Sequence, residues 1–223
     1  MIRSINERHV EKRSETLWTQ IESLLAKPGM TLGDVDVFGV CVGPGAFTGL
    51  RIGMAAVQGL STASNKPVVG VTSLEAAAFG AGPGGLVCAM VNAYKGEVYS
   101  QLFSFDDDGI PVASNEPTVS GFKEALDRIA DLNEFVLAGD AVEAGMEVIE
   151  KVAKGGNGRK WTIRQSDQPL AAAVAGLAYL KNTRGEAGTA EALRACYVRP
   201  SEAEIKLSLG LLGSKIKRSM KSE

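Results

Sequence analysis

Histidine is almost absent from this chain of 223 residues, because His9 is the only one. Metal sites built on His-x-x-x-His or His-Glu-x-x-His need two histidines and are therefore excluded. A Ser-His-Asp triad would have to use His9, which lies in a charged N-terminal segment and is interpreted as a surface residue. No pair of carboxylates forms an evident acid–base couple. The sequence therefore offers no catalytic constellation.

Cysteine and long hydrophobic runs are also scarce. The three cysteines, Cys41, Cys88 and Cys196, are far apart, and the first two lie in apolar, strand-like runs. This favours buried free thiols in a reducing cytoplasm over a disulfide or a metal site. No apolar run approaches the roughly 20 residues of a membrane span, and the charged N-terminus lacks a signal-peptide core. We expect a cytoplasmic protein without membrane contact.

Charge of one sign is not in excess either. Lys and Arg number 24 against 26 Asp and Glu, which gives a net charge of -2 and argues against a free-standing nucleic-acid binder. Hydrophobic residues make up 45% and charged residues 22%, which is typical of soluble globular chains. The length is enough for one large domain or two lobes with a substantial core.

The most informative stretch is the run Gly-Pro-Gly-Ala-Phe-Thr-Gly-Leu-Arg-Ile-Gly at residues 43–53, which follows an apolar stretch at residues 37–42. A strand that ends in glycines and leads into a helix can stabilise an anion or a close backbone contact. No Gly-Lys-Ser/Thr follows, so the turn is not a Walker A loop. Thr48 stands where a dinucleotide fingerprint has its third glycine. Gly43, Gly45 and Thr48 therefore form either a purely structural turn or one that shapes a nucleotide or partner site.

The helix expected at residues 48–64 is apolar almost all round, with Arg51 and Gln58 as its strongly polar side chains before the last turn. Such a helix should be buried on most sides, so one face is expected on a sheet and another on a second subunit. Its small residues permit close approach of another backbone, either of its own sheet or across a subunit boundary. In the second case Leu17, Trp18 and Ile21 of the preceding helix would contribute.

The pattern of the N-terminal part predicts a parallel βαβ arrangement. A helix capped by Ser14 ends at Pro28-Gly29, strands are expected at residues 37–42 and 68–71, and Thr72 with Glu75 has capping-box spacing for a third helix. The glycine-rich residues 80–85 are the expected lobe boundary. This divides the chain into a first lobe with partner-binding helices at residues 1–80, a second lobe at 86–200 and a basic tail at 201–223.

The expected second lobe opens with a hairpin of residues 86–91 and 97–105. The acidic residues 106–108 with Gly109 are interpreted as a solvated turn, since the spacing of a calcium-binding loop is absent. Helices are predicted at 122–129, from Gly139-Asp140 to 153 and at 169–180, with a strand at 135–138 and a loop at 154–160. The tail is interpreted as a surface amphipathic helix or as a segment that touches RNA phosphate or a partner.

The run at residues 43–53 closely resembles the signature of the bacterial TsaB (YeaZ) family. Four further stretches agree with the family in order: residues 13–17, 67–76, 92–99 and 197–200. The resemblance implies a two-lobed α/β fold of the actin/Hsp70/sugar-kinase type and a role in making threonylcarbamoyladenosine beside the tRNA anticodon. It also implies a non-catalytic dimerisation subunit.

The implied partner is TsaD, a paralogue that holds the metal through histidines and transfers the threonylcarbamoyl group, and the ATPase TsaE joins the pair. In this family the first two helices form the subunit interface. The resemblance places in it Ser14, Leu17, Trp18, Ile21, Gly49, Ile52, Gly53, Ala56 and Leu60. It implies no metal and no tightly bound cofactor, with ATP or ADP only at the complex interface, and tRNA is reached indirectly through the complex.

Family members have a β-hairpin and a third strand before the first helix, whereas only residues 1–12 precede Arg13 here. We therefore expect a first lobe truncated at its N-terminus and no independent ATP binding. Two alternatives remain: a nucleotide-dependent phosphotransferase of the same fold, and a regulator that acts as a homodimer.

Overall fold

The N-terminal half of the first lobe is a strand–helix–strand–helix unit in the computed structural model, which describes residues 5, 13–26, 29–154, 160–166 and 168–199. Strands β1 (Phe38–Gly43) and β2 (Val68–Thr72) pair in parallel, and α2 (Phe47–Ser64) connects them and packs on β1. The predicted βαβ arrangement is confirmed.

The ends of these elements follow from local chemistry. Asn65 ends α2 in the left-handed conformation, with φ at 54°, and Pro67 follows shortly after it. The predicted capping box of α3 (Ser73–Ala81) is also present. The Thr72 hydroxyl accepts a hydrogen bond from the Glu75 N–H at 3.0 Å, and the Glu75 carboxylate accepts one from the Thr72 N–H at 3.4 Å.

The second sheet is larger and has six strands in the order β5-β4-β3-β7-β8, with β6 also paired to β4. Its strands are β3 (Val87–Tyr94), β4 (Glu97–Phe105), β5 (Pro111–Ala113), β6 (Thr118–Gly121), β7 (Glu134–Ala138) and β8 (Lys160–Ile163). β3 and β4 form the predicted antiparallel hairpin, while β3, β7 and β8 run parallel.

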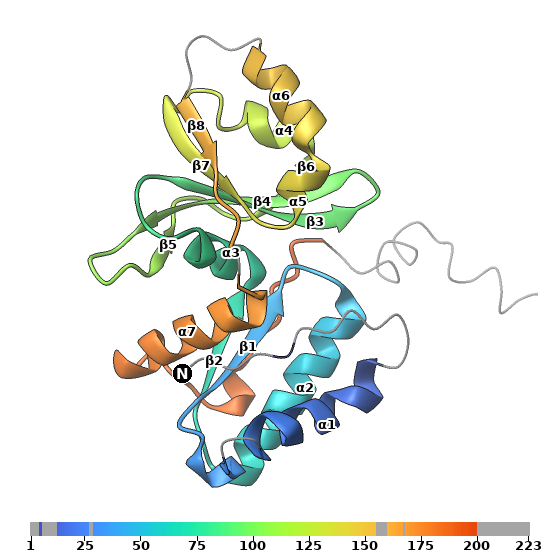
Figure 1. The fold of residues 1–223 in the computed structure, drawn as a ribbon, viewed down its shortest axis with the longest axis vertical. Coiled ribbons are helices and arrows are strands. Elements are labelled where there is room, and N and C mark those ends of the chain that lie inside the picture. Colours follow the sequence, from blue (N-terminus) through green and yellow to red (C-terminus); the bar gives the residue numbers. More distant parts are fainter. Residues whose placement is uncertain (1–4, 6–12, 27–28, 155–159, 167, 200–223) are drawn as a thin grey trace, which may run out of the picture.

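Helices lie on both faces of this second sheet (Figure 1). Cys88 and Met90 of β3 belong to the core under α4 (Phe122–Asp127), α5 (Ala141–Ala144) and α6 (Met146–Lys154). The alternate residues Val87 and Ala89 pack with α3 on the opposite face. The sheet is therefore buried on both sides, and α3 lies on the side toward the first lobe.

The last described part of the chain returns to the first sheet. Helix α7 (Leu170–Thr183) packs on β1, β2 and α3, and Gly188 exchanges two backbone hydrogen bonds of 2.9 Å with Val68 of β2. A short helical turn, η2 (Ala190–Ala192), then packs against α2. The expected second lobe of residues 86–200 thus keeps its own sheet only as far as β8. The apolar pattern of α7 predicts a helix but not the sheet on which it packs.

Some local predictions differ from the structure. Ser14 lies inside α1 (Arg13–Ala26), which begins one residue earlier. The single helix expected to reach residue 153 is broken at Gly145 into α5 and α6, and the Phe122 ring occupies the place of a side chain at this glycine. The acidic turn is ion-paired, since Asp106 and Asp108 both contact Arg184. The strands β5, β6 and β8 are additions that the sequence pattern did not indicate.

Two of the sequence-based interpretations concern residues outside the described part of the chain. These residues are His9 and the basic tail at 201–223. Within the described part of the chain, no helix is both long and apolar enough to cross a membrane.

Candidate functional site

The glycine turn lies at the carboxyl ends of β1 and β2. The Ser73 hydroxyl, at the start of α3, donates a buried hydrogen bond of 2.6 Å to the Pro44 carbonyl oxygen. This bond connects the two strand-to-helix junctions of the first sheet directly. The turn is therefore held by the start of α3 as well as by its own backbone.

Gly43 is required in this turn by a close approach of the chain's last described segment. Its φ is +111°, and a Cβ at this position would lie 2.7 Å from the Cys196 carbonyl oxygen. The Cys196 N–H also donates to the Val42 carbonyl oxygen at 2.8 Å. Gly45, in contrast, has open space where its Cβ would be. The first glycine thus serves packing, and the second lies on the accessible side of the turn.

Three side chains form an aromatic and cationic cluster at the start of α2. The ring centroids of Phe47 and Tyr197 are 5.4 Å apart, and the Arg51 guanidinium carbon lies 3.9 Å from the centroid of the Phe47 ring. The Arg51 Nε–H donates to the Tyr197 hydroxyl at 3.4 Å. Phe47 is 36% exposed and Tyr197 50%, so this Phe47–Arg51–Tyr197 cluster can be reached from outside.

The β3–β4 hairpin also meets this segment. Arg199 donates from Nη1 to the Glu97 carboxylate at 2.6 Å, at the start of β4. On the neighbouring turn, the Tyr94 N–H donates to the Asn92 side-chain oxygen at 2.7 Å, and the Asn92 N–H donates to Asp140 at 3.0 Å. Four of the sequence stretches quoted above, residues 43–53, 67–76, 92–99 and 197–200, are therefore connected by these contacts.

A small cavity of about 210 Å³ lies beside Gly139 and Asp140. Its lining consists of Ala76, Ala77, Val91, Gly139, Asp140, Gln165, Ser166, Gln168, Leu170 and Ala173. Ligand pockets usually measure about 300–1,000 Å³, and the one charged lining residue, Asp140, would repel phosphate. The residues of this cavity do not fit a nucleoside triphosphate.

The described residues supply no other evident reactive group. Among them, no three His, Cys, Asp or Glu side chains come together as metal ligands. Burial raises the pKa of the Cys88 thiol to about 12, and it also raises the pKa of Cys41 and Cys196. These thiols therefore stay protonated and are weak nucleophiles at neutral pH.

A family model described as TsaD, tRNA N6-adenosine threonylcarbamoyltransferase, matches residues 7–182. The chain is 32% identical over 102 residues to the tRNA threonylcarbamoyladenosine biosynthesis protein TsaB of Escherichia coli (strain K12), covering 44% of each. It is 35% identical over 98 residues to TsaB of Haemophilus influenzae, covering 43% of this chain and 42% of the relative. Each alignment spans less than half the length of the curated relative.

Two solved structures cover more of the chain. One, described as an uncharacterized protein from Pseudomonas aeruginosa with similarity to peptidase YeaZ, superimposes with a TM-score of 0.66 at 26% identity over 83% of both chains. YeaZ from Pseudomonas aeruginosa gives a TM-score of 0.65 at 26% identity over 82% of this chain and 83% of that one. The chain belongs to this TsaD-like family, in its TsaB (YeaZ) branch.

Membership of the TsaB family confirms the expected actin/Hsp70/sugar-kinase-like two-lobed α/β fold. The truncation of the first lobe stays a prediction, as does the interface of α1 and α2. The structure places the residues of that interface as follows. Trp18 is 48% exposed, Gly49 is exposed, and Leu17, Ile21, Ile52, Gly53 and Leu60 are half-buried. Ser14 lies in the first turn of α1, and its side chain is outside the described set.

Ala56 stands apart among the residues of the predicted interface. It is only 8% exposed, although it stands two residues, or about 200° around the helix, from Met54, which packs into the core on β1. The chain itself therefore covers this part of the outer face of α2. The face that remains exposed is rotated from the expected one and carries Thr48, Arg51, Ala55, Gly59 and Thr62.

The sequence analysis quoted Phe47, Tyr197, Glu97 and Arg199 in family motifs but gave them no role. Their contacts join residues about 100 to 150 positions apart, so no local pattern predicts them. For the exposed face of α2, the sequence did carry a signal, which is the spacing of Ala55, Gly59 and Thr62 at intervals of three or four.

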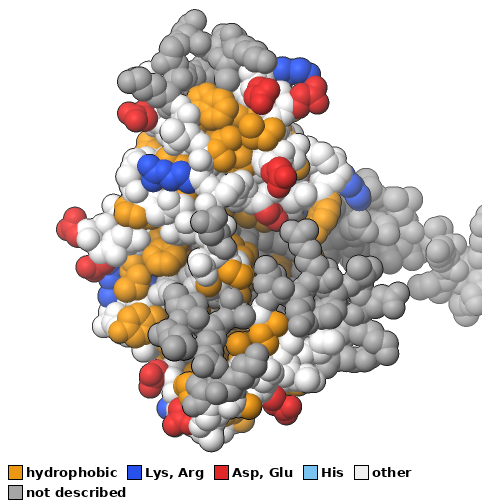
Figure 2. Space-filling model, in the orientation of Figure 1, with side chains coloured by type: hydrophobic (Ala, Val, Ile, Leu, Met, Phe, Trp, Pro, Cys, Tyr) orange, Lys and Arg blue, Asp and Glu red, His pale blue; other side chains and the backbone are white. Residues whose placement is uncertain are grey.

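On the face shown in Figure 2, the described Lys and Arg side chains stand singly among Asp and Glu, and form no basic patch there.

Proposed function

We propose that this chain is a non-catalytic TsaB-like subunit that pairs with a TsaD-like threonylcarbamoyltransferase in the modification of tRNA to threonylcarbamoyladenosine. The observation that carries the proposal is the exposed face of α2. It presents Thr48, Ala55, Gly59 and Thr62 in a row and ends at the Phe47–Arg51–Tyr197 cluster.

This face suits a helix of a partner protein. Ala55 and Gly59 carry little or no side chain, so a second helix can approach the backbone of α2 closely. Phe47, Arg51 and Tyr197 belong to residue types that often anchor protein interfaces, and their mutual contacts hold them in place before binding. Trp18 of α1, nearly half exposed, can add a second anchor.

The residue composition of this chain indicates which subunit holds the metal centre. With one histidine in the whole sequence, a metal centre held by paired histidines belongs to the partner. We further propose that a TsaE-like ATPase joins the pair, that ATP or ADP binds only at the complex interface, and that tRNA is reached through the complex.

The test is size-exclusion chromatography with light scattering, with and without purified TsaD from the same source. We expect a one-to-one complex with the parent chain and at least a tenfold weaker complex with Gly59→Leu or Trp18→Asp. Gly59 has open space around its Cβ position, and glycine is an unfavourable residue inside a helix by about 1 kcal/mol. The Gly59→Leu variant should therefore fold at least as well as the parent, and lost binding would report the interface.

Lys123→Leu, on the exposed side of α4, introduces the same side chain at a distant site and should bind as the parent does. If Gly59→Leu and Trp18→Asp both retain full affinity for TsaD, the assigned face is wrong. A homodimer that ignores TsaD would support the regulator alternative, and ATP turnover by the isolated chain would support the phosphotransferase.

A further inference from the structure

The last described residues, 195–199, cross from one lobe to the other, and we call this segment the strap. Its first part belongs to the core of the first lobe. Ala195 and Cys196 pack against the cluster of Val40, Val42, Met54, Val68 and Leu193. The hydrogen bond from the Cys196 N–H to Val42 fixes the backbone at the end of β1.

The second part of the strap belongs to the core that α3 forms with the second sheet. Val198 packs against the cluster that contains Tyr99 and Phe103 of β4. Arg199 then forms its ion pair with Glu97, and both side chains are about one-third exposed, at 35% and 33%. An ion pair shielded to this degree is stronger than a fully exposed one, and it also fixes the relative orientation of its two side chains.

Between these two anchors lies Tyr197, whose ring contacts Phe47 at the start of α2. Three successive residues of the strap thus contact different parts of the molecule. Cys196 contacts the first core, Tyr197 the accessible cluster at the glycine turn, and Val198 the second core. In Figure 1 the strap lies to the right of α3, beside the upper end of α2. α3 packs on both sides of the boundary between the lobes. A change in the angle between the lobes about α3 would also have to break the Arg199 pair, remove Val198 from its core or pull Tyr197 from Phe47.

We propose that the strap is a latch that sets the angle between the two lobes and couples that angle to the position of the α2 N-terminus. Arg199 and Glu97 form its anchor on the second lobe, and Cys196 with Gly43 forms its anchor on the first. When the Arg199 anchor is released, the second lobe moves relative to α2. The proposal concerns the free chain and does not depend on the identity of any partner.

The test measures the distance between the lobes by electron–electron double resonance. Spin labels on p-acetylphenylalanine at Thr62 of α2 and Lys123 of α4, both exposed, leave the native cysteines unchanged. We expect a narrow distance distribution in the parent and a broadened or shifted one in Arg199→Ala. The reversed pair Glu97→Arg with Arg199→Glu should restore the narrow distribution.

Arg128→Ala is the matched control, because Arg128 pairs with Glu124 at 2.7 Å wholly within the second lobe, and its distribution should equal that of the parent. Tyr197→Ala removes a half-exposed side chain without opening the core and is the second variant, in case Arg199→Ala does not fold. If both strap variants give the parent distribution, even with lowered melting temperatures, the strap is only a stabilising contact and the latch is ruled out.

Discussion

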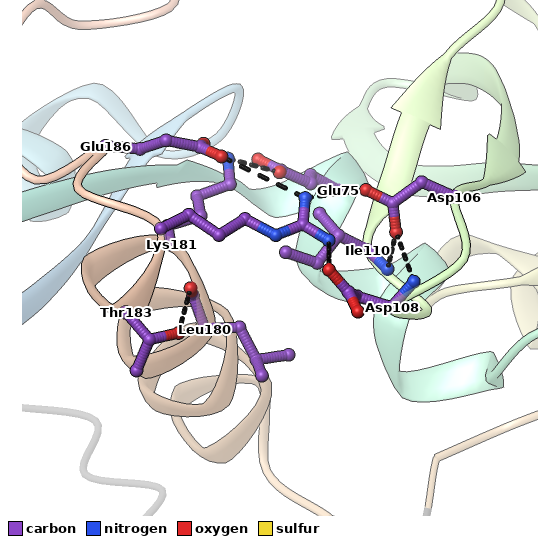
Figure 3. Close-up of polar contacts among 9 residues, drawn as sticks. Glu75, Asp106, Asp108, Ile110, Leu180, Lys181, Thr183 and Glu186 are labelled. Carbon is purple, nitrogen blue, oxygen red and sulfur yellow. Dashed lines mark hydrogen bonds and ion pairs between the residues drawn. The ribbon is translucent and has the colours of Figure 1, made fainter.

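Besides the packing of α3 between the two sheets, two junctions connect the lobes, and they differ in kind. The strap combines apolar packing, a backbone hydrogen bond, an aromatic contact and one ion pair. The other junction, at the C-terminal end of α7, combines ion pairs with the buried side chain of Ile110, which packs against the apolar face of α7 (Figure 3). There Arg184 pairs with Asp106 at 2.6 Å and with Asp108, and Lys181 pairs with Glu75 at 2.5 Å. In Figure 1 this ionic junction lies at the left, near β5, and the strap lies to the right of α3.

The difference predicts which changes weaken each junction. Exposed ion pairs contribute little stability on average and weaken with salt. Asp108 is 69% exposed, so its pair with Arg184 should respond to the solvent. The strap is anchored in two apolar cores and should respond mainly to changes of shape. The junction that resists solvent is the one beside the proposed partner face.

The largest expected effect comes from a methyl group at the first-lobe anchor of the strap. Gly43→Ala places a Cβ 2.7 Å from the Cys196 carbonyl oxygen on a backbone with φ of +111°. We expect the free energy of unfolding to fall by about 2–4 kcal/mol from clash and backbone strain. Urea denaturation measures this, with Gly45→Ala as the control, because open space surrounds the Gly45 Cβ position. Equal losses in the two variants would contradict the close approach of the strap.

A smaller effect is expected at the ionic junction. The Lys181 and Glu75 side chains are only 18% and 12% exposed, so Lys181→Met leaves a largely buried carboxylate without its cation. We expect a loss of about 1–3 kcal/mol in the free energy of unfolding. Lys123→Met breaks an exposed pair with Asp127 and should cost less than about 0.5 kcal/mol. A cost at Lys181 as small as that at Lys123 would show that the Lys181–Glu75 pair adds no more stability than an exposed pair does.

The smallest effect is a dependence on pH at the ionic junction. Hydrogen bonding by Arg184 lowers the pKa of Asp106 to about 2, below the value of about 3.9 in an unfolded chain. Asp106 therefore stabilises the fold fully above about pH 4, and this stabilisation is lost as the pH falls toward 2. Carbon-detected NMR titration of the Asp106 carboxyl measures the pKa directly. In Arg184→Ala it should rise toward the ordinary value, whereas in Arg199→Ala it should not move.

The first sheet and its helices could be predicted closely from the sequence. Apolar strand patterns, the capping box of Thr72 and Glu75, and the glycine turn are all local signals. The predicted bounds of β1, α2 and β2 never differ from the observed ones by more than one residue. The family resemblance also predicted the fold class. These features depend on neighbours within a few positions, which a single sequence displays.

The contacts that define the site could not be predicted in this way. Arg184 meets Asp106 across 78 positions and Arg199 meets Glu97 across 102, so the acidic residues looked like a solvated turn and the arginines had no visible partner. Ala56 looked available because its helix has small residues on more than one side, and only tertiary packing decides which side is covered. The thiols of Cys41, Cys88 and Cys196 are free, as expected.

The return of the chain to its first sheet has a consequence for synthesis on the ribosome. Residues 87–163 form the second sheet from one continuous stretch, whereas β2 receives its Gly188 contact and β1 its Cys196 contact more than 100 residues after both strands have been made. Since nascent domains fold as their residues emerge, the sheet that is translated first is the one that is completed last. Until then its apolar strands stay open to other chains, which gives a partner or a chaperone a defined interval in which to bind.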